Sequence, residues 1–462
     1  MQPLAGGTET EATNLFDVER FRRRLRGKLV LPTDPEYEGA RRVWNGIVDK
    51  KPALIAYCAG PEDVAEAVMF ARSNEALASV RSGGHNIAGN SVCDGGLVID
   101  LSRMKGIEVD PDRRIARAEA GLTLGEFDTA TQEFGLATTM GVNSDTGIAG
   151  LTLGGGFGKL GRAYGLACDN LVAADVVTAD GRLLRASASE NTDLFWGLRG
   201  GGGNFGIVTA FEYKLHPVGP KVLAGSLVYD YAPAQDAFRF YHEFSRNAPD
   251  ELSADAALAT APSGERLFSI SVCYSGSVDE GERVLKPLRA YGTPVQDQIT
   301  PVPYLQVQSG GDSLFPPGHR YFWKAQFLRE ITDAAIATLL RAYATTPSAM
   351  SLAVLQQVGG AIARVPVSAT AYGSRDAAYD CFPISIWEDP ADDEANIHWA
   401  REVWAAMRPY STGAVYVNNL GDEGENRVQA AYGDNYPRLI ALKNKYDPTN
   451  SFHLNQNIRP TR

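Results

Sequence analysis

The chain has 462 residues, which is too long for one ordinary hydrophobic core and predicts two or three domains. Hydrophobic residues make up 44% and charged residues 21%, a globular balance that excludes a disordered or low-complexity protein. The net charge of −11 and the lack of a long basic run argue against nucleic acid as a partner.

The N-terminal residues 1–14 are polar and acidic and lack the apolar core of a signal peptide, and no later stretch approaches the roughly 20 apolar residues of a membrane span. The five cysteines are scattered and include no Cys-x-x-Cys pair. These features predict a soluble, cytoplasmic protein without a membrane partner. The six histidines show no metal-ligand spacing, so no metal site is indicated.

The first half of the chain alternates glycine clusters with regular elements. Glycines gather around residues 83–96, 141–165 and 197–206, and strand-type segments flank them, so these loops are not flexible linkers. We expect strands at residues 97–101, 173–178 and 207–215, and amphipathic helices at residues 62–72 and 123–134. This half is therefore mixed α and β.

The pattern changes around residues 217–220, where glycine becomes rarer and alternating strands begin. The elements expected after this point are strands at residues 268–274, 352–358 and 379–387, a helix at residues 278–291, and a short strand at residues 415–418. We predict that a second domain begins near residue 217.

Two of the glycine-rich loops suit a phosphate-bearing ligand. Residues 81–86 and 141–158 present successive small residues, whose backbone N–H groups can form concave anion sites. Two such loops for one ligand indicate a diphosphate or a dinucleotide. A third loop, residues 201–206, matches Gly-x-Gly-x-x-Gly but precedes a strand rather than a helix, which disfavours a Rossmann fold and a nicotinamide-dependent dehydrogenase. His85 is either exposed to the ligand of these loops or an ordinary structural histidine.

Together these residues resemble a known family, the FAD-linked oxidases of the vanillyl-alcohol oxidase type, in the berberine bridge enzyme-like branch. The resemblance covers nearly the whole chain and is carried by residues 81–86, 147–170, 195–209, 416–418, 446–450 and 455–458. It implies an α+β fold with a two-lobed PCMH-type FAD-binding domain, residues 1–218 plus 411–462. It also implies an inserted substrate domain, residues 219–410, built on an antiparallel sheet flanked by helices. Our boundary near residue 217 agrees with this division.

The resemblance implies FAD as the cofactor, bonded covalently through His85. A second link through cysteine, which many relatives form, is excluded because Asn143 stands at that position. Cys168 does not match the cysteine motif and is expected to be a small buried residue. The cofactor-binding residues that the resemblance implies are Arg81, Ser82, Gly83, Gly84, His85, Asn86, Gly89, Val142, Asn143, Thr146, Gly147, Gly150, Gly154, Gly155, Gly158, Gly206, Ile207, Val208, Asn418 and Asn457.

Thr146 stands where relatives carry the residue that guards oxygen access to the flavin. Threonine is no bulkier than the valine found in many oxidases, so we expect oxygen to reach the flavin. The alternative is that the Thr146 hydroxyl only bonds the backbone of its loop.

Asp380 is the candidate catalytic base, because the resemblance places an acid here and a hydride-abstracting enzyme needs a base near the flavin. In the alternating run from Asp380 to Ile386 this carboxylate shares a strand face with apolar side chains, which predicts a raised pKa. The alternative is an aspartate at the start of an edge strand in water. Asn419 stands where some relatives use a tyrosine base, so that mechanism is unavailable here.

Gln356 and Tyr416 are the further catalytic candidates, with substrate-orienting roles that the resemblance implies. A buried glutamine that bonds only within the core is the alternative for Gln356. Tyr321 and Trp323 would suit a ring-shaped substrate, but a core stripe explains them equally well.

The sequence thus predicts an FAD-dependent oxidase that removes a hydride from a C–H next to a hydroxyl or amine of a small molecule, with O2 as acceptor and H2O2 released. One alternative is a tailoring flavin oxygenase or cyclase of secondary metabolism. Another is a flavin-binding protein without turnover. We expect a monomer or homodimer.

Overall fold

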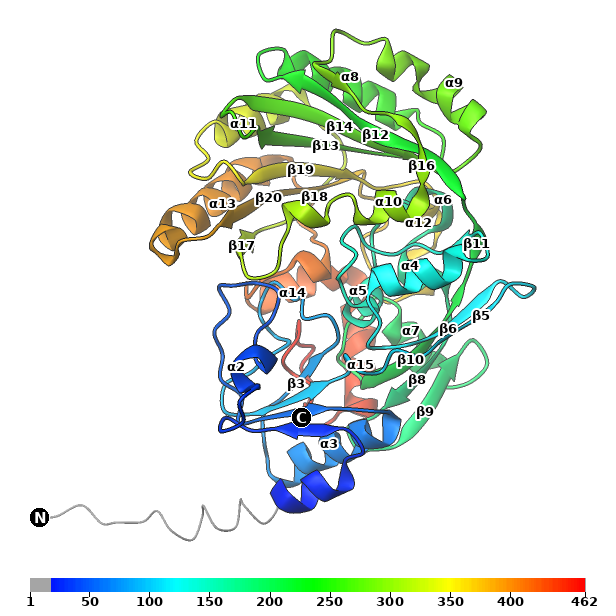
Figure 1. Cartoon of the computed structure of the whole chain (residues 1–462), viewed down its shortest axis with the longest axis vertical. Coiled ribbons are helices and arrows are strands. Elements are labelled where there is room, and N and C mark those ends of the chain that lie inside the picture. Colours follow the sequence, from blue (N-terminus) through cyan, green and yellow to red (C-terminus); the bar gives the residue numbers. More distant parts are fainter. Residues whose placement is uncertain (1–17, 462) are drawn as a thin grey trace, which may run out of the picture.

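The computed structural model describes residues 18–461, and Figure 1 shows their arrangement. The first sheet has the order β1-β2-β4-β3, with parallel pairs on both sides of β4. Its strands are β1 (Lys28–Val30), β2 (Leu54–Tyr57), β3 (Ala78–Arg81) and β4 (Leu97–Asp100). Helix α3 (Pro61–Ser73) connects β2 to β3. Because both strands run parallel to β4, they need a crossover connection of this kind rather than a tight turn. The predictions of a helix at 62–72 and a strand at 97–101 are confirmed to within one residue at each end.

The second sheet is antiparallel, with the order β5-β6-β10-β8-β9. Its strands are β5 (Ile107–Asp110), β6 (Ile115–Glu119), β8 (Leu171–Val177), β9 (Leu183–Ser187) and β10 (Ile207–Lys214). Helix α4 (Leu124–Gln132) begins at a capping box in which Thr123 and Glu126 bond each other's backbone N–H groups. The remaining elements of this half are α2 (Tyr37–Ala40), β7 (Leu136–Ala137), α5 (Ile148–Gly154), α6 (Gly161–Tyr164), η1 (Ala167–Asn170), α7 (Thr192–Leu198) and β11 (His216–Pro217).

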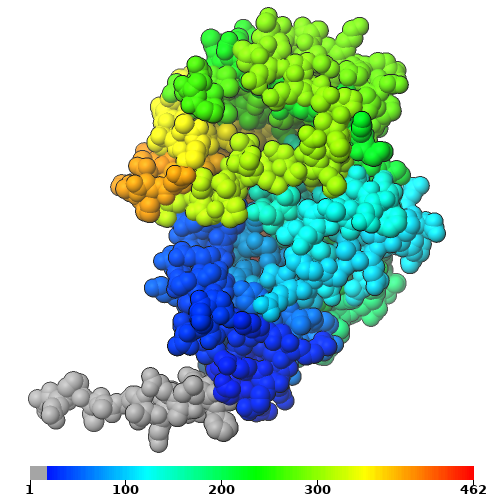
Figure 2. Space-filling view, viewed as in Figure 1, coloured from blue at the N-terminus to red at the C-terminus, as the bar shows by residue number. Residues whose placement is uncertain are grey.

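The middle of the chain forms a nine-stranded antiparallel sheet, with the order β15-β12-β14-β13-β19-β20-β17, in which β16 also pairs with β12 and β18 with β20. Its strands are β12 (Lys221–Asp230), β13 (Leu252–Thr260), β14 (Arg266–Tyr274), β15 (Gln296–Asp297), β16 (Thr300–Pro303), β17 (Arg320–Trp323), β18 (Gln326–Leu328), β19 (Leu352–Gln357) and β20 (Tyr379–Trp387). This sheet occupies the upper part of Figure 1, and residues of this segment form the upper half of the face in Figure 2.

Four helices pack on one face of this sheet, namely α8 (Ala234–Arg246), α9 (Val278–Arg289), α11 (Asp333–Tyr343) and α13 (Asp393–Met407). Alternate strand residues such as Ala254, Ile270 and Leu355 enter this apolar layer, so the residues between them face the other way. On that opposite side lie the glycine-rich loops and α10 (Tyr304–Ser309), as Figure 1 shows. The other short elements are η2 (Asp312–Leu314), α12 (Ala361–Arg364), η3 (Val367–Ala369), η4 (Pro390–Asp392) and η5 (Arg408–Tyr410).

The C-terminal segment returns to the first half of the chain through η6 (Val417–Asn419), α14 (Glu425–Tyr432), η7 (Gly433–Asn435) and α15 (Tyr436–Tyr446). The prediction of a strand at residues 415–418 is wrong, because this stretch makes one 3-10 turn. The Tyr416 hydroxyl accepts a hydrogen bond from Gly156 N, and Asn418 donates to Leu151 O. These side-chain contacts to α5 and its following loop hold the segment without a partner strand.

Two large hydrophobic clusters organise the molecule. One joins the first half to the C-terminal segment, through residues such as Phe211 and Leu439, and includes Ala325 and Ala371 from the middle. The other lies entirely between residues 223 and 407. We therefore propose the division expected from the sequence, residues 1–218 plus 411–462 and residues 219–410. No helix between residues 18 and 461 combines the length and apolar character needed to cross a membrane.

Candidate functional site

A cavity of about 890 Å³ separates the glycine-rich loops from the open face of the nine-stranded sheet. Its lower wall comes from three loops, residues 82–86, 141–147 and 202–208. Its upper wall comes from strands β12, β13, β14, β19 and β20, which present side chains such as Gln356 and Phe382. The cavity therefore lies where the two parts of the fold meet, which is a common position for ligand sites.

Close backbone contact between two loops explains why glycine is needed here. A Cβ on Gly83 would lie 2.2 Å from Gly147 N, and one on Gly147 would lie 2.3 Å from Gly83 N. Any side chain at either position would force these loops apart. Gly150 and Gly203, by contrast, face open space and line the cavity, so a ligand can approach their backbone closely.

The structure brings most of the expected cofactor residues to this one cavity. Those that line it are Ser82, Gly83, Gly84, His85, Asn86, Val142, Asn143, Thr146, Gly147, Gly150, Gly206, Ile207, Val208 and Asn418. Among the expected catalytic residues, Gln356 and Tyr416 also line the cavity.

Six expected cofactor residues lie behind the cavity wall instead. Arg81 is buried and paired with Asp100, with 2.5 Å between Nε and Oδ2, so it fixes the end of β3. Four glycines pack against protein neighbours: Gly89 on Val48, Gly154 on Asn418, Gly155 on Tyr372 and Gly158 on Met140. Asn457 is outside the cavity lining. Their positions suit a role in shaping the loops rather than in touching a ligand.

His85 is held at the cavity wall by three neighbours. Its ring stacks on Trp44 with centroids 4.8 Å apart, Nε2 lies 3.0 Å from Asp145 Oδ1, and Nδ1 lies 3.4 Å from the Thr146 hydroxyl. Trp44 also stacks on Tyr321 of β17, so the imidazole rests against an aromatic pair that joins the two parts of the chain. Sequence reasoning missed Trp44, because a lone tryptophan outside the glycine motifs carries no local signal.

The polar atoms of the wall fit a large ligand with hydrogen-bond donors. Within residues 18–461, the buried acceptors Asn143 Oδ1 and Asn455 Oδ1 have no hydrogen-bond partner, and both side chains line the cavity. Leaving such acceptors unpaired costs free energy, so a ligand that donates to them is favoured. Apolar lining from Ile207 and Leu153 suits the flat ring of a flavin. The residues present therefore fit FAD, which they would hold between the loops.

Asp380 is buried in the middle of the sheet. Strand β20 pairs with β19 on one side and with β17 and β18 on the other, so the alternative of an exposed edge strand is wrong. The side chain is fully buried, and this burial raises its pKa to about 7, although a hydrogen bond from Asn419 opposes the shift. The raised pKa agrees with the prediction from its apolar strand face.

The surroundings of Asp380 connect it to the cavity. Asn419 Nδ2 donates to Asp380 Oδ2 over 2.8 Å, and Asp380 Oδ1 has no partner within residues 18–461. Asp380 itself is outside the lining, but Asn419, Gln356 across the strand pair, and Phe382 on the same strand face all line the cavity. Sequence reasoning used Asn419 only to exclude a tyrosine base and missed that its amide orients the aspartate.

Tyr416 and Asn418 act together from the C-terminal segment. The Tyr416 hydroxyl accepts hydrogen bonds from Gly156 N at 2.8 Å and from Asn418 Nδ2 at 2.7 Å. Burial raises the pKa of Tyr416 well above its ordinary value, so the phenol stays protonated. Cys168 is fully buried nearby, as expected, and burial raises the pKa of its thiol well above the usual range, which makes it a poor nucleophile.

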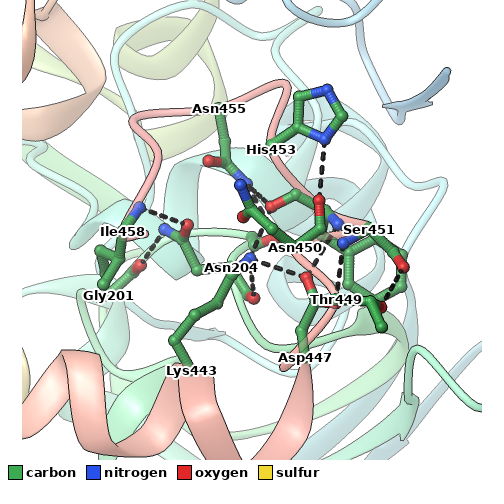
Figure 3. A network of polar contacts seen from close by, with 12 residues as sticks. Gly201, Asn204, Lys443, Asp447, Thr449, Asn450, Ser451, His453, Asn455 and Ile458 are labelled. Atoms are coloured by element: carbon green, nitrogen blue, oxygen red, sulfur yellow. Dashed lines mark hydrogen bonds and ion pairs between the residues drawn. The ribbon is translucent and has the colours of Figure 1, made fainter. Parts of the chain in front are cut away.

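A buried network fixes the last part of the cavity wall (Figure 3). Lys443 Nζ donates to Asp447 Oδ2 at 2.7 Å, to Asn204 O at 3.0 Å and to Phe452 O at 2.8 Å. Asn455 Nδ2 then donates to Gly203 O. The network thus ties the C-terminal segment to the third glycine-rich loop.

We expect Asp447→Ala to destabilise the protein by about 3–5 kcal/mol, because it leaves the fully buried Lys443 ammonium without its counter-ion. The matched control is Lys445→Ala, which removes the exposed ion pair with Asp193 and should cost less than about 1 kcal/mol. Urea unfolding of both variants measures the difference. Equal stability of the two variants would show that the buried pair does not hold the segment.

Comparisons with known proteins identify the family of the chain. Residues 52–187 match the family described as FAD binding domain, and residues 415–459 match the family described as berberine and berberine like. The chain is 34% identical to an FAD-linked oxidoreductase of Dictyostelium discoideum, over 96% of this chain and 97% of that protein.

Two further similar proteins are both 6-hydroxynicotine oxidases. The chain is 33% identical to (R)-6-hydroxynicotine oxidase of Paenarthrobacter nicotinovorans, over 94% of this chain and 97% of that protein. The crystal structure of 6-hydroxy-D-nicotine oxidase from Arthrobacter nicotinovorans superposes with a TM-score of 0.88 and 29% identity, covering 95% of this chain and 98% of that one. The expected two-part fold is confirmed, and the chain belongs to the berberine bridge enzyme-like FAD-linked oxidoreductases, which have a PCMH-type FAD-binding domain.

Proposed function

We propose that this FAD-dependent oxidoreductase is an oxidase that converts a CH–OH (or CH–NH) group of a small molecule to the C=O (or C=N) group and passes the two electrons to O2. For an alcohol the reaction balances when each alcohol and each O2 consumed give one carbonyl compound and one H2O2. The observation that carries the proposal is Asp380, a carboxylate with a pKa raised to about 7, buried in the sheet wall opposite the loops that fit FAD. A pKa near neutrality suits a general base at working pH.

The bound FAD supplies a two-electron acceptor for the hydride. Asp380 Oδ1, the carboxylate oxygen without a partner within residues 18–461, takes the proton from the substrate hydroxyl or amine. Asn419 holds the other oxygen and so fixes the direction of the free one. Gln356 and Tyr416, which line the cavity beside this carboxylate, orient the substrate.

O2 as the acceptor is supported by two observations. The relative at 33% identity is named an oxidase. Thr146 lies at the cavity wall next to His85. Because threonine is a small residue, it leaves space in the cavity beside His85.

We expect Thr146→Leu to slow the reaction of reduced enzyme with O2 by at least about tenfold, equivalent to about 1.4 kcal/mol in the barrier, because a larger side chain fills the oxygen path. Anaerobic reduction by substrate should keep its rate. Stopped-flow mixing of reduced enzyme with oxygenated buffer measures the first rate. Unchanged reoxidation would mean that the hydroxyl only bonds its loop.

The covalent link through His85 is also part of the proposal. It is supported by the position of the ring at the cavity wall and by Asn143, which removes a second attachment point. The cytoplasm is our proposed compartment, because all five cysteines are free and buried. A monomer or homodimer is our proposed assembly.

The proposed reaction is tested by turnover under ¹⁸O2 with a panel of alcohols and amines. The expected result is a product without the label and H2O2 in equal amount to it. Label in the organic product would identify a flavin oxygenase instead, and flavin that no compound bleaches would identify a protein without turnover.

A further inference from the structure

A row of polar side chains crosses the cavity face of the nine-stranded sheet. Strand pairing places Ser226 opposite Ser271, Ser271 opposite Asp255, and Gln356 opposite Asp380. Extending the pairing register of β13 and β19 by one residue places Asp255 beside Gln356. Because residues opposite one another share a face, these five side chains form one line from Asp380 across to β12.

On the same face, one neighbouring row is apolar from β13 to β20. Ala257 pairs with Val354, and Val354 with Phe382. Beyond them Ile384 lies opposite Trp323, and both line the cavity. The upper wall therefore offers an apolar surface beside a polar line, and only one end of that line is used by the proposed proton transfer.

The middle of the line holds a cation. Lys159, in the loop between α5 and α6, extends to the sheet and donates from Nζ to Asp255 Oδ2 over 2.7 Å. Asp255 Oδ1 accepts from Gln357 N at 2.9 Å, so both carboxylate oxygens are occupied. Burial opposes the charge on Lys159, but ion pairing with Asp255 outweighs it and raises the pKa of the ammonium. Lys159 is thus charged at neutral pH.

The ammonium keeps donors for a ligand. It carries three N–H groups, and Asp255 is its sole hydrogen-bond partner within residues 18–461. Both side chains line the cavity, and each is less than one-fifth exposed. A nearly buried ammonium with unused donors is expensive unless a ligand supplies acceptors.

The backbone around Lys159 is fixed, so the ammonium has a defined position. Gly158 lies so close to Met140 that a Cβ would come within 1.8 Å of the Met140 carbonyl oxygen. Arg162, three residues further on, is buried and donates to the carbonyl oxygens of Leu252, Val358 and Ala248. The loop is thus packed against Met140 on one side of Lys159 and tied to the nine-stranded sheet through Arg162 on the other.

We propose that Lys159 and Asp255 form a recognition subsite for an accepting oxygen, a carbonyl or hydroxyl, at the far end of the substrate. This inference rests on the proposed oxidase function. Asp255 lies two strands from Asp380, which corresponds to about 10 Å at the usual strand spacing. The substrate class is therefore an elongated alcohol or amine, with an apolar or aromatic body against Val354 and Phe382 and a distal oxygen about 10 Å from the oxidised carbon.

The test uses two probes that differ only in the distal oxygen: 4′-acetylbiphenyl-4-ylmethanol and its 4′-isopropyl analogue. Calorimetry on the FAD-loaded protein measures their dissociation constants. We expect the wild type to bind the acetyl probe about tenfold more tightly, since a hydrogen bond from a charged donor contributes in that range. Lys159→Met should abolish this preference.

Two further variants make the result specific. Lys159→Met alone leaves the Asp255 carboxylate without its counter-ion, which could destabilise the variant. The double variant Lys159→Met and Asp255→Asn removes this charge and should also show no preference between the probes. Lys221→Met, an exposed lysine at the start of β12, should keep the wild-type preference. Equal affinity of the two probes for the wild type, including no binding of either, would overturn the subsite, as would a preference that survives in both Lys159 variants.

Flavin reduction by the acetyl probe, measured separately, distinguishes the two proposals. A binding preference that depends on Lys159, with flavin that no alcohol or amine bleaches, would keep the subsite and overturn the oxidase. Bleaching by both probes with equal affinities would keep the oxidase and overturn the subsite.

Discussion

Asp380→Asn is expected to lower the limiting rate of flavin reduction by substrate by about 10²–10⁴-fold, the usual contribution of a general base. The amide has the shape of the carboxylate but cannot take a proton. FAD binding should be unchanged, because Asp380 is outside the set of residues that line the cavity. Anaerobic stopped-flow absorption measures the rate.

The pH dependence of the same rate identifies the group. Burial raises the pKa of Asp380 to about 7, so the carboxylate is deprotonated and active above that pH and protonated below it. The wild-type rate should therefore rise with pH and level off above about 7, while the Asp380→Asn rate should lose this step. Asp376→Asn, an exposed aspartate paired with Arg329, is the control and should retain both rate and profile. A wild-type profile that persists in Asp380→Asn would assign the base to another residue.

His85→Ala is expected to abolish the proposed covalent bond to the flavin completely. After acid precipitation the wild-type pellet should stay yellow, whereas the variant should release its FAD into the supernatant. The variant should still bind FAD before precipitation, because the loops that line the cavity are unchanged. Loss of the bond should also lower the flavin potential and slow substrate oxidation.

His398→Ala is the matched control, since this histidine is exposed on α13 and far along the chain from the loops. It should behave as the wild type. A wild-type pellet that is colourless, with all FAD in the supernatant, would show that His85 holds the flavin only by contact with its ring.

The sequence predicted regular elements best where periodicity agreed with tertiary contacts. Strand β20 has the bounds expected from its alternating pattern, and α4 starts at the capping residues. The C-terminal stretch at residues 415–418 failed because its β-branched and aromatic residues favour a strand locally, while contacts of Tyr416 and Asn418 with α5 and its following loop impose a turn. No local pattern contains those contacts.

The site residues divide in the same way, into those with a local sequence pattern and those placed only by tertiary contacts. The meeting of the glycine-rich loops at one cavity was predictable because close backbone approach leaves a pattern in the sequence, whereas His85 was singled out by the family resemblance. Asp380 was found through its strand face and the family resemblance. Trp44, Asn419 and Lys159 were missed, because each acts through a partner far away in the chain: Tyr321, Asp380 and Asp255, respectively.

The central claim is that bound flavin takes electrons from a substrate in the cavity and passes them to oxygen. The measurement that tests it most directly is the flavin spectrum during anaerobic addition of an alcohol or amine, followed by admission of air with peroxide assayed. We expect bleaching that needs Asp380, then full return of the oxidised spectrum with one H2O2 formed for each flavin reoxidised. Flavin that bleaches but stays reduced in air, with no peroxide, would contradict it and identify a dehydrogenase.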